Sequence, residues 1–383
     1  MLELLSNYWC MVFHMKLYDR VKDLPVRIDD YHLQFREENC TGDFARASVV
    51  LSVQDAKPDA SEFRRPCTQL TLRGGGIEGN GEDVTYDSVD HHALLDSSAS
   101  LPLTGEYTVE SFSEALEKVD LFPHGPPERE ASRHYRRWAF ESAALDLALK
   151  QADTDLATAL DRTYTPVWFV VSNRLGDPPT FDRVETWLEI NPELEFKLDI
   201  TAGWTGDLIE TLAGTGAVRI LDFKGQYNGT MVDQPSDPDL YQQLITAFPS
   251  ALIEDPVLTD ETRSIFRGEE SRITWDTPIT DIESIEELPF KPTRLNVKPS
   301  RFGSIENCFE TIEYCLNHDI GMYGGGQTEL GVGRQHIHAL ASLFYPSAPN
   351  DIAPRAYNHP EPLSGLAKSP LAPPSDPRGF EWS

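Results

Sequence analysis

The stretch that decides the fold runs from Glu195 to Gly333 and contains six short segments. In each of them an apolar run leads into charged residues or glycines near its C-terminal end. They read EFKLDI (195–200), VRILDFKG (218–225), ALIEDP (251–256), RITWDTP (272–278), RLNVKPS (294–300) and IGMYGGGQTELGVG (320–333). Side chains alternate between the two faces of a strand, so the polar members of each segment share one face. Helical patterns lie between several of these segments, and the alternation predicts a parallel β/α barrel.

Three carboxylates end consecutive segments at intervals of roughly one strand and one helix: Asp222, Glu254 and Asp276. In a barrel, the C-terminal strand ends form the active site. Three carboxylates there supply the hard oxygen ligands that Mg²⁺ prefers and leave a position for a substrate oxygen atom. We therefore predict a metal site at these residues, and the alternative is that they are helix N-caps or turn residues.

A lysine ends the next segment, RLNVK, in which Asn296 and Lys298 face the barrel interior. Lys298 is the predicted general base. A divalent cation or Lys197 nearby would lower the pKa of Lys298 by disfavouring its charged form. The alternative is a structural ion pair between Lys298 and one carboxylate.

The series K-x-D, D-x-K, I-E-D-P, W-D-T and V-K-P-S-R-F-G resembles the enolase superfamily, and most of all its branch of muconate lactonising enzymes, o-succinylbenzoate synthases and dipeptide epimerases. GIEGNGE (76–82) and WAFESAALDLALK (138–150) are similar to the capping-domain strand of that family and to the helix before its barrel. The resemblance implies a modified TIM barrel with an N-terminal α+β capping domain. It also implies Mg²⁺, with Mn²⁺ as a substitute, and abstraction of a proton α to a carboxylate.

The expected domains are a cap over residues 1–155, a barrel over 156–350 and a proline-rich tail over 351–383 that returns to the cap. Residues 1–20 are a candidate upstream extension, and Met1 and Met15 are alternative starts. Within the cap we expect strands at 47–53 and 69–75 and helical structure between 111 and 150. In the barrel we expect a first strand at 167–172 and helices that include 181–190 and 259–266.

Three positions depart from the family pattern. Asp199 stands where the family often has the second lysine of a K-x-K motif, Lys224 stands where D-x-N is commoner, and Thr277 stands where many relatives have glutamate. Lys197 is therefore assigned an electrostatic or hydrogen-bonding role. Asp199 remains open between acid/base catalysis and an ion pair, and Lys224 between contact with an anionic substrate and pairing with a neighbouring carboxylate.

The glycine-rich segment supplies a further predicted site residue, Glu329, which resembles the seventh-strand glutamate of the family. Lys224, Asn296 and Glu329 are assigned to substrate binding. The three consecutive glycines allow close backbone approach, and the amides of the following helix N-terminus are candidates for binding a carboxylate. His336 and His338 are interpreted as structural or surface residues, and no mandelate-racemase-like His–Asp dyad is visible.

The composition restricts the partners. Asp and Glu total 62 against 33 for Lys and Arg, and the formal charge of −29 argues against binding to nucleic acid or anionic membranes. Five cysteines without C-x-x-C spacing favour reduced thiols and a cytoplasmic location. No signal peptide or membrane span is visible in the sequence. We expect a small carboxylate substrate and a homo-oligomer.

The predicted function is a Mg²⁺-dependent lyase or isomerase, in which proton abstraction leads to elimination, cycloisomerisation or epimerisation. Because Asp199 removes the usual second lysine, elimination by one base is slightly favoured. The alternative is a catalytically silent barrel that acts as a binding or structural protein. Arg133, Arg136 and Arg137 are interpreted as a solvated or snorkelling face, and contact with an anionic substrate or another subunit is the alternative. Substrate choice is assigned to cap loops near Tyr31–Asp43.

Overall fold

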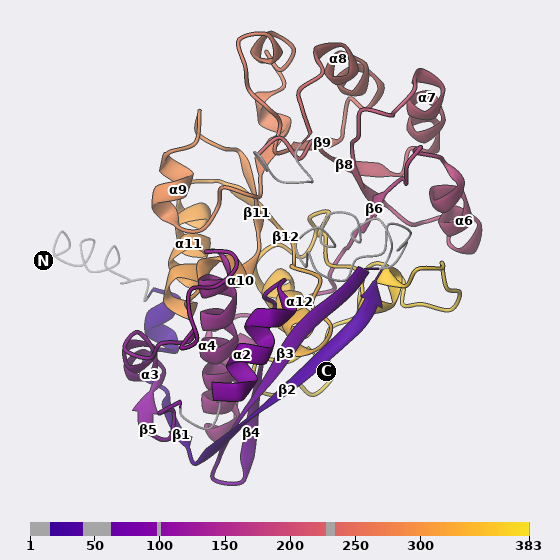
Figure 1. Ribbon diagram of the computed structural model, residues 1–383. Helices are drawn as coiled ribbons and strands as arrows, with labels where there is room; N and C mark the ends of the chain where they lie inside the picture. Colours follow the sequence, from indigo (N-terminus) through magenta and orange to yellow (C-terminus); the bar gives the residue numbers. More distant parts are fainter. Residues whose placement is uncertain (1–15, 41–62, 98–100, 227–233, 383) are drawn as a thin grey trace, which may run out of the picture.

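The computed structural model describes residues 16–40, 63–97, 101–226 and 234–382, and Figure 1 shows a capping domain at the edge of a larger β/α domain. The strand predicted at 47–53 and the alternative start sites lie outside the described residues. In the cap, two short strands pair antiparallel, β1 (Pro25–Ile28) and β5 (Gly105–Thr108). Three longer strands form a second antiparallel sheet in the order β2 (Asp30–Cys40), β3 (Phe63–Gly74) and β4 (Ile77–Asp83).

Helices complete the cap: η1 (Tyr18–Arg20), α2 (Ser88–Ser97), α3 (Val109–Leu116), α4 (Ser132–Gln151) and α5 (Leu156–Ala159). The helical stretch expected between 111 and 150 is thus two helices. Helix α3 begins with a capping box, because Thr108 and Ser111 each accept a hydrogen bond from the other's backbone amide. The expected loop near Tyr31–Asp43 is strand β2 as far as Cys40, and the rest of it lies outside the described residues.

Small residues let strand β4 lie directly against helix α4. A Cβ atom added to Gly81 would stand 1.9 Å from the carbonyl oxygen of Ala139, and one added to Gly79 would stand 2.4 Å from the carbonyl oxygen of Ala143. Real side-chain atoms cannot approach so closely. The glycines of GIEGNGE are therefore required by this contact.

The larger domain is built on a parallel sheet of seven strands. In spatial and chain order these are β6 (Val171–Arg174), β7 (Phe196–Asp199), β8 (Val218–Asp222), β9 (Leu252–Glu254), β10 (Ile273–Trp275), β11 (Arg294–Val297) and β12 (Gly321–Gly324). All six segments quoted at the start contain a strand. The first strand is shorter than predicted and lies nearer the C-terminus, because Val167 and Phe169 form only isolated bridges.

Asn350 closes the barrel between β12 and β6. Its backbone oxygen accepts from the amide of Val170 at 2.8 Å, and its side-chain oxygen accepts from the amide of Gly324 at 2.6 Å. The amide of Asp351 donates to the carbonyl of Gly324 at 2.8 Å. In the described chain, this short segment occupies the place of an eighth strand, as in a modified TIM barrel.

Helices surround the sheet: α6 (Asp182–Ile190), α7 (Gly206–Thr215), α8 (Pro238–Ala247), α9 (Ile282–Glu286), α10 (Pro299–Phe302), α11 (Ile305–Asn317) and α12 (Val332–Phe344). Figure 1 shows α6, α7 and α8 along its outer side. Short 3₁₀ turns complete it: η3 (Thr262–Ser264), η4 (Glu270–Arg272) and η5 (Arg355–Asn358). The α-helix predicted at 259–266 was wrong: Thr259 and Thr262 bind each other's backbone amides as at a helix start, but only the 3₁₀ turn η3 follows.

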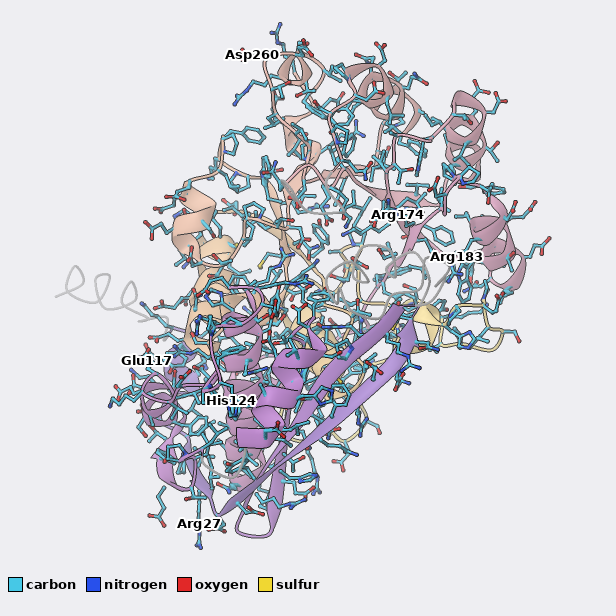
Figure 2. The ribbon with its side chains drawn as sticks, viewed as in Figure 1. Arg27, Glu117, His124, Arg174, Arg183 and Asp260 are labelled. Carbon is cyan, nitrogen blue, oxygen red and sulfur yellow. The ribbon has the colours of Figure 1, made fainter. Side chains whose placement is uncertain are left out.

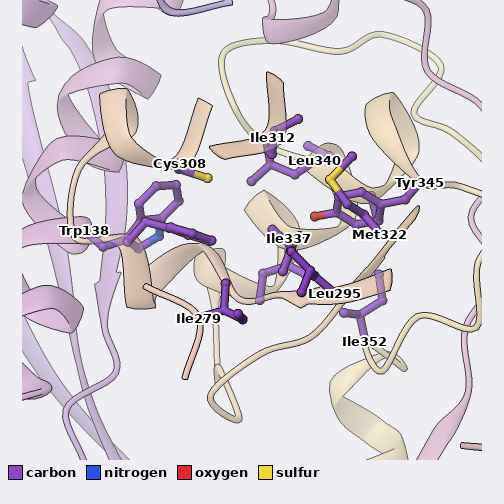
Figure 3. Close-up of a cluster of buried hydrophobic side chains, with 14 of the residues drawn as sticks. Trp138, Ile279, Leu295, Cys308, Ile312, Met322, Ile337, Leu340, Tyr345 and Ile352 are labelled. Carbon is purple, nitrogen blue, oxygen red and sulfur yellow. The ribbon is translucent and has the colours of Figure 1, made fainter. Parts of the chain in front are cut away.

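The two domains share one hydrophobic core. Trp138 of α4 belongs to the same buried cluster as Leu295 of β11 and Ile312 of α11, and Figure 3 shows these side chains together with Cys308. Cys308 and Cys315 are fully buried, free thiols, in agreement with a core role. Acidic side chains such as Glu117 and Asp260 lie at the exposed periphery (Figure 2).

The proline-rich end of the chain lies against the cap helix α4. The amide of Phe380 donates to Asp146 at 2.8 Å, and Lys150 pairs with Glu381 at 2.6 Å. Among the described residues, no helix combines the length and the apolar character needed to cross a membrane.

The expectation of a solvated face at Arg133, Arg136 and Arg137 was wrong for Arg136. This side chain is fully buried and donates to Asp83 at 2.7 Å and to the carbonyls of Leu121 and Asp90 at 2.9 Å each. A buried guanidinium group needs such partners for all its donors. Helical spacing alone could not distinguish Arg136 from Arg133, whose side chain is 43% exposed.

Candidate active site

Polar side chains gather at the C-terminal ends of β7 to β11, where the sequence placed them. Short strands with alternating faces bring them inward, and each is at least nine-tenths buried: Lys197, Asp199, Asp222, Glu254, Asp276, Asn296 and Lys298. Burial of so many ionisable groups costs free energy unless each has a partner. The partners divide them into three groups.

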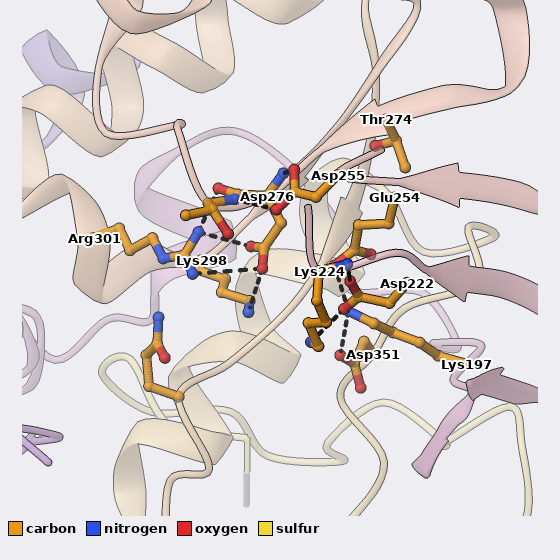
Figure 4. Close-up of polar contacts among 12 residues, drawn as sticks. Lys197, Asp222, Lys224, Glu254, Asp255, Thr274, Asp276, Lys298, Arg301 and Asp351 are labelled. Atoms are coloured by element: carbon orange, nitrogen blue, oxygen red, sulfur yellow. Dashed lines mark hydrogen bonds and ion pairs between the residues drawn. The ribbon is translucent and has the colours of Figure 1, made fainter. Parts of the chain in front are cut away.

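Lys197 holds the first group together. Its ammonium lies 3.1 Å from Asp222 and 3.2 Å from Asp351, and it donates a short hydrogen bond to Glu254 (Figure 4). Burial alone would lower the pKa of Lys197, but Asp222 and Glu254 hold it well above its usual value. Lys197 is therefore a permanent cation in this arrangement. It does not pair with Asp199, which was one of the options left open by the sequence.

Lys298 and Arg301 hold the second group, on the other side of the view in Figure 4. The Lys298 ammonium donates to Asp276 Oδ2 at 2.8 Å, and Arg301 Nη1 donates to Asp276 Oδ1 at 2.9 Å. Burial raises the pKa of Asp276, but Arg301 and Lys298 lower it below its usual value. The ion pair considered for Lys298 is thus present, and Arg301 shares the same carboxylate.

The third group contains two departures from the family pattern. Lys224 lies 3.3 Å from Asp199 and 2.5 Å from Asp222. Burial raises the pKa of Asp199, and Lys224 opposes that shift. Lys224 has a φ of 54°, a conformation that is uncommon for a residue with a side chain. Asp199 replaces the second lysine of the K-x-K motif at the end of β7, and Lys224 from the end of β8 places an ammonium group beside it.

The residue after Glu254 supports the neighbouring strand. Asp255 accepts hydrogen bonds from the backbone amides of Asp276 and Thr277, both at 2.9 Å. Burial and the neighbouring Asp276 raise the pKa of Asp255 to about 6. Asp255 therefore has a supporting role, because it fixes the backbone that carries Asp276.

The predicted metal ligands are close to cations rather than to one common point. Asp222 and Glu254 meet at Lys197, whereas Asp276 is directed to Lys298 and Arg301. Over residues 16–40, 63–97, 101–226 and 234–382, no three His, Cys, Asp or Glu side chains are arranged to hold a metal ion. The three-carboxylate ligand set stays a prediction.

The chemistry of the donors nevertheless fits a divalent cation. All are oxygen atoms, and the Lys197 ammonium shows that a cation is accepted between Asp222 and Glu254. Burial raises the pKa of Glu254, and the charges of Asp222 and Asp276 add to that shift. A further positive charge would relieve this repulsion. Mg²⁺ binding would require Lys197 to withdraw from the carboxylates.

Asn296 lies beside Lys298 and is almost fully buried. Neither its oxygen nor its nitrogen has a hydrogen-bond partner among the described residues. A Cβ atom on Gly325 would stand 2.3 Å from Asn296 Oδ1, so the close backbone approach expected of the glycine run occurs here. The amide is therefore a group whose hydrogen bonds a bound molecule can complete.

One expectation for the glycine-rich loop was wrong, and the assignment of Glu329 to substrate binding stays a prediction. Glu329 stays within the loop, where it accepts from the Gln327 amide at 2.6 Å and pairs with Arg334 at 3.4 Å. The amides at the start of α12 are not available to a substrate carboxylate. Glu82 of the cap accepts from the amides of Leu330, Gly331 and Gly333 at 2.6, 2.9 and 2.8 Å. A carboxylate already satisfies this helix N-terminus.

These groups surround a cavity of about 80 Å³, lined among others by Lys197, Lys224, Lys298, Gln327 and Arg334. An adjoining cavity of about 420 Å³ lies between the end of β2 and η5, and Asn358 lines both. The inner space holds only a few atoms, whereas typical ligand sites occupy several hundred Å³. A substrate larger than a small acid would therefore extend into the outer cavity.

Four residues at the site were missed from sequence: Tyr86, Arg301, Tyr323 and Asp351. Tyr86 and Asp351 line the inner cavity, and Tyr323 donates to Glu254 at 2.5 Å. Arg301 lies within the quoted V-K-P-S-R-F-G motif, three residues after Lys298, and that spacing on a helical turn was a usable signal. Asp351 comes from the segment that closes the barrel, for which no strand pattern exists.

Comparison with known proteins matches both parts of the chain to one family. Residues 54–159 match "Domain of unknown function (DUF8230) N-terminal domain", and residues 163–359 match its C-terminal domain. An o-succinylbenzoate synthase from Geobacillus kaustophilus is 25% identical over 73% of this chain and 74% of its own. An N-succinylamino acid racemase from Thermus thermophilus is 26% identical over 87% and 86%.

Solved structures share the fold. A dipeptide epimerase from Methylococcus capsulatus complexed with Mg ion gives a TM-score of 0.63 at 15% identity, covering 93% of this chain and 99% of its own. The muconate lactonizing enzyme from Pseudomonas putida gives 0.60 at 17% identity, with 92% and 96% covered. A mandelate racemase/muconate lactonizing protein from Herpetosiphon aurantiacus gives 0.65 at 14% identity. The modified TIM barrel with an N-terminal cap, predicted from sequence, is confirmed.

Proposed function

The chain belongs to the DUF8230 family and shares its fold with members of the enolase superfamily, and on that premise we propose that it is a Mg²⁺-dependent enzyme of that superfamily that removes a proton α to a substrate carboxylate. The observation that carries the proposal is the placement of Lys298. Its ammonium lines the inner cavity at the end of β11, together with Lys197 and Lys224 from the ends of β7 and β8. A carboxylate in this cavity would meet cations and place its α-carbon near an amine.

Asp222, Glu254 and Asp276 would hold the Mg²⁺ ion. When bound, the ion would polarise the substrate carboxylate and neutralise the charge that develops on it as the proton leaves. The donor set supports this assignment, because oxygen ligands suit Mg²⁺ and the buried carboxylates repel one another.

Lys298 would take the proton, and its neighbours would prepare it to do so. Arg301 binds Asp276 through Oδ1, so the carboxylate remains paired when Lys298 turns toward the substrate. Lys197, displaced from the carboxylates when Mg²⁺ binds, would stabilise negative charge that develops on the substrate. Asn296 would donate to or accept from the substrate beside Lys298, because neither of its polar atoms has a partner in the part of the chain that the structure describes.

The step after proton removal separates a lyase from an isomerase. The names of the relatives include a synthase, a racemase and an epimerase, so they do not select one outcome. Asp199 pairs at 3.3 Å with Lys224, which is one of the lysines that line the inner cavity. We retain elimination with Lys298 as the single base as the favoured outcome, with epimerisation and cycloisomerisation as alternatives.

Isotope exchange tests the proposal directly. The protein is incubated with Mg²⁺ in ²H₂O and a panel of small carboxylic acids that includes N-succinylamino acids and dipeptides, and deuterium at the α-carbon is measured by NMR. We expect exchange or conversion of at least one class of acid. A complete lack of exchange across a broad panel would contradict the proposal and favour a catalytically silent barrel.

A further inference from the structure

The two carboxylate oxygens of Glu254 have different partners. Oε2 accepts a hydrogen bond from the hydroxyl of Tyr323 at 2.5 Å, and Oε1 accepts from the ammonium of Lys197. Glu254 and Tyr323 are both fully buried, so bulk water does not compete for either contact. Oε2 is therefore tied to strand β12, and Oε1 is the oxygen that meets a cation.

The phenol of Tyr323 is fixed from two directions. Its ring belongs to a buried apolar cluster with residues of β8 and β9 and the residue before β6, which places it inside the barrel: Ile220, Leu252 and Val170. Its oxygen accepts from the Thr274 hydroxyl at 3.4 Å, which leaves its own proton for Glu254. A side chain enclosed in this way cannot follow Glu254 if the carboxylate turns.

The other two predicted metal ligands show the same division. In Asp222, Oδ1 accepts from the backbone amide of Lys224 at 3.1 Å, and Oδ2 lies beside lysine ammonium groups. In Asp276, Oδ1 accepts from Arg301 Nη1 at 2.9 Å, and Oδ2 accepts from Lys298 at 2.8 Å and from Arg301 Nη2 at 3.4 Å. Each carboxylate thus has one oxygen held by a donor other than a lysine side chain and one oxygen beside a lysine ammonium.

We propose that Tyr323 is a positioning residue that restricts Glu254 to one oxygen toward a bound divalent cation, and that it thereby sets a preference of the site for Mg²⁺ over Ca²⁺. The proposal rests on the metal site of the proposed function and adds how that site selects its ion. A carboxylate that binds through both oxygens must turn until both face the ion. Such a turn of Glu254 would break its hydrogen bond with Tyr323 and leave a buried hydroxyl without an acceptor.

Coordination chemistry connects this restriction to the size of the ion. Mg²⁺ takes about six oxygens in near-octahedral geometry, whereas Ca²⁺ takes about six to eight at longer distances and often binds both oxygens of one carboxylate. Three single carboxylate oxygens, completed by water and substrate, suit Mg²⁺ and leave Ca²⁺ short of ligands. Both ions carry the same charge, so the ratio of their affinities reports the arrangement of the ligands rather than the charge of the site.

Tyr323 is the donor whose removal isolates this effect. The donor to Asp222 Oδ1 is a backbone amide, which no side-chain substitution removes, and loss of Arg301 would remove a positive charge. Tyr323→Phe removes one hydroxyl group and keeps both the charge of the site and the aromatic ring in the apolar cluster. The carboxylate of Glu254 is then free to turn.

Calorimetric titrations of the full chain with MgCl₂ and with CaCl₂ test the proposal. The wild-type protein should bind Mg²⁺ more tightly. In Tyr323→Phe the affinity for Mg²⁺ should fall about tenfold, as is typical when the partner of a metal ligand is lost, while the affinity for Ca²⁺ falls less. The ratio of the two affinities should therefore move about fivefold or more toward Ca²⁺, the worth of one hydrogen bond. An unchanged ratio, including an equal loss for both ions, would overturn the proposal.

Two further variants separate this role from a general effect on packing. Thr274→Val removes the hydroxyl that contacts the Tyr323 oxygen and should move the ratio in the same direction by a smaller factor, and it decides the question if Tyr323→Phe does not fold by circular dichroism. Tyr345→Phe removes a buried hydroxyl that has no hydrogen-bond partner within the described ranges, and it should leave the ratio unchanged. A shift as large in Tyr345→Phe would count against Tyr323.

The titrations are independent of turnover. If the ratio shifts in Tyr323→Phe but no acid of the panel exchanges deuterium, the role of Tyr323 stands and the proposed reaction fails. If an acid exchanges deuterium and the ratio does not respond, the reaction stands and the role of Tyr323 fails. A wild-type protein that binds neither ion would overturn both.

Discussion

Two regions of this molecule bury charged side chains, and they differ in what those charges bind. In the cap and at its contact with the barrel, a group named the seam here and made up of Arg65, Glu82, Asp83 and Arg136, most hydrogen bonds go to the backbone. Glu82 accepts from three amides, and Arg65 donates to carbonyls on both sides. At the barrel mouth, the lysines bind carboxylate side chains around a cavity.

The difference indicates how each region functions. Backbone groups cannot move away or change their charge, so the seam charges are fixed and act as structural connections. Side-chain ion pairs at the mouth can rearrange when a cation or a carboxylate enters. We infer that a buried charge is available for chemistry when its partners are other side chains that line a cavity, and the following predictions test that distinction.

The largest expected effect comes from Lys298→Met at the mouth. Loss of a general base typically lowers the rate by about 10² to 10⁴. The fold should survive, because Arg301 still pairs with Asp276. Deuterium exchange measures the rate, and circular dichroism checks the fold. Lys291→Met, at an exposed position, is the matched control. Exchange at the normal rate in Lys298→Met would remove it from the role of base.

At the seam the corresponding substitution is Arg136→Met, which should lower the free energy of unfolding rather than the rate of deuterium exchange. It leaves Asp83 buried without its 2.7 Å partner, and breaking a buried pair typically costs about 3–5 kcal/mol. Urea denaturation measures the free energy of unfolding. Arg133→Met at the exposed end of α4 should change it by less than about 1 kcal/mol. Similar losses in both variants would contradict the contrast drawn between them.

Binding of Mg²⁺ at the barrel mouth should raise the free energy of unfolding. A ligand that binds only the folded state at about 100 times its Kd adds about 2.7 kcal/mol to the free energy of unfolding. Thermal unfolding with and without Mg²⁺ measures this gain, and Glu254→Gln should abolish it. Glu261→Gln, at an exposed position, should retain it. An unfolding midpoint that does not respond to Mg²⁺ in the wild-type protein would favour the silent barrel.

The smallest effect is expected at His336, whose ring stacks on Phe380 at 4.2 Å and makes no hydrogen bond among the described residues. Burial lowers its pKa from 6.5 to about 3. Below pH 6.5 the unfolded chain therefore binds a proton that the folded chain does not, and stability falls as the pH decreases toward 3. His336→Phe should flatten this decline and change stability at pH 7 by less than about 1 kcal/mol.

His338 provides the comparison for that experiment. Burial lowers its pKa to about 4, but its Nε2 atom also hydrogen-bonds the carbonyl of Ile352 at 2.7 Å. His338→Phe should flatten the acid decline and also lower stability at pH 7, because the carbonyl loses its partner. An unchanged pH profile in His336→Phe would show that its ring does not titrate differently on unfolding.

Sequence reasoning succeeded where a local pattern determined the outcome. Strands β7 to β12 and the long helix α4 were predicted because alternation and helical periodicity are properties of the chain itself, and the cap strand β4 was predicted from the family resemblance of GIEGNGE. It failed at residues 259–266, where a helix-start pattern at Thr259 and Thr262 leads only into the 3₁₀ turn η3. It also misplaced Arg136, because helical periodicity gives the face of a residue but not what covers that face.

The site was predicted in part for the same reason. The positions of Lys197, Asp222, Glu254, Asp276 and Lys298 at strand ends follow from strand periodicity and from the topology of a parallel barrel. Strand periodicity and barrel topology do not predict which lysine pairs with which carboxylate. The pairing of Lys224 with Asp199 depends on a left-handed backbone turn, and Asp351 reaches Lys197 from a segment 154 positions along the chain.

The sequence by itself therefore determined the barrel, its cap, and the edge of the sheet at which charged groups collect, because these depend on the order of polar and apolar residues along the chain. Only the tertiary structure decided that Glu82 occupies the start of α12, that Arg65 and Tyr86 hold Gln327, and that the mouth carboxylates meet lysines. Those contacts join residues far apart in sequence, and their geometry is set by packing between the two domains.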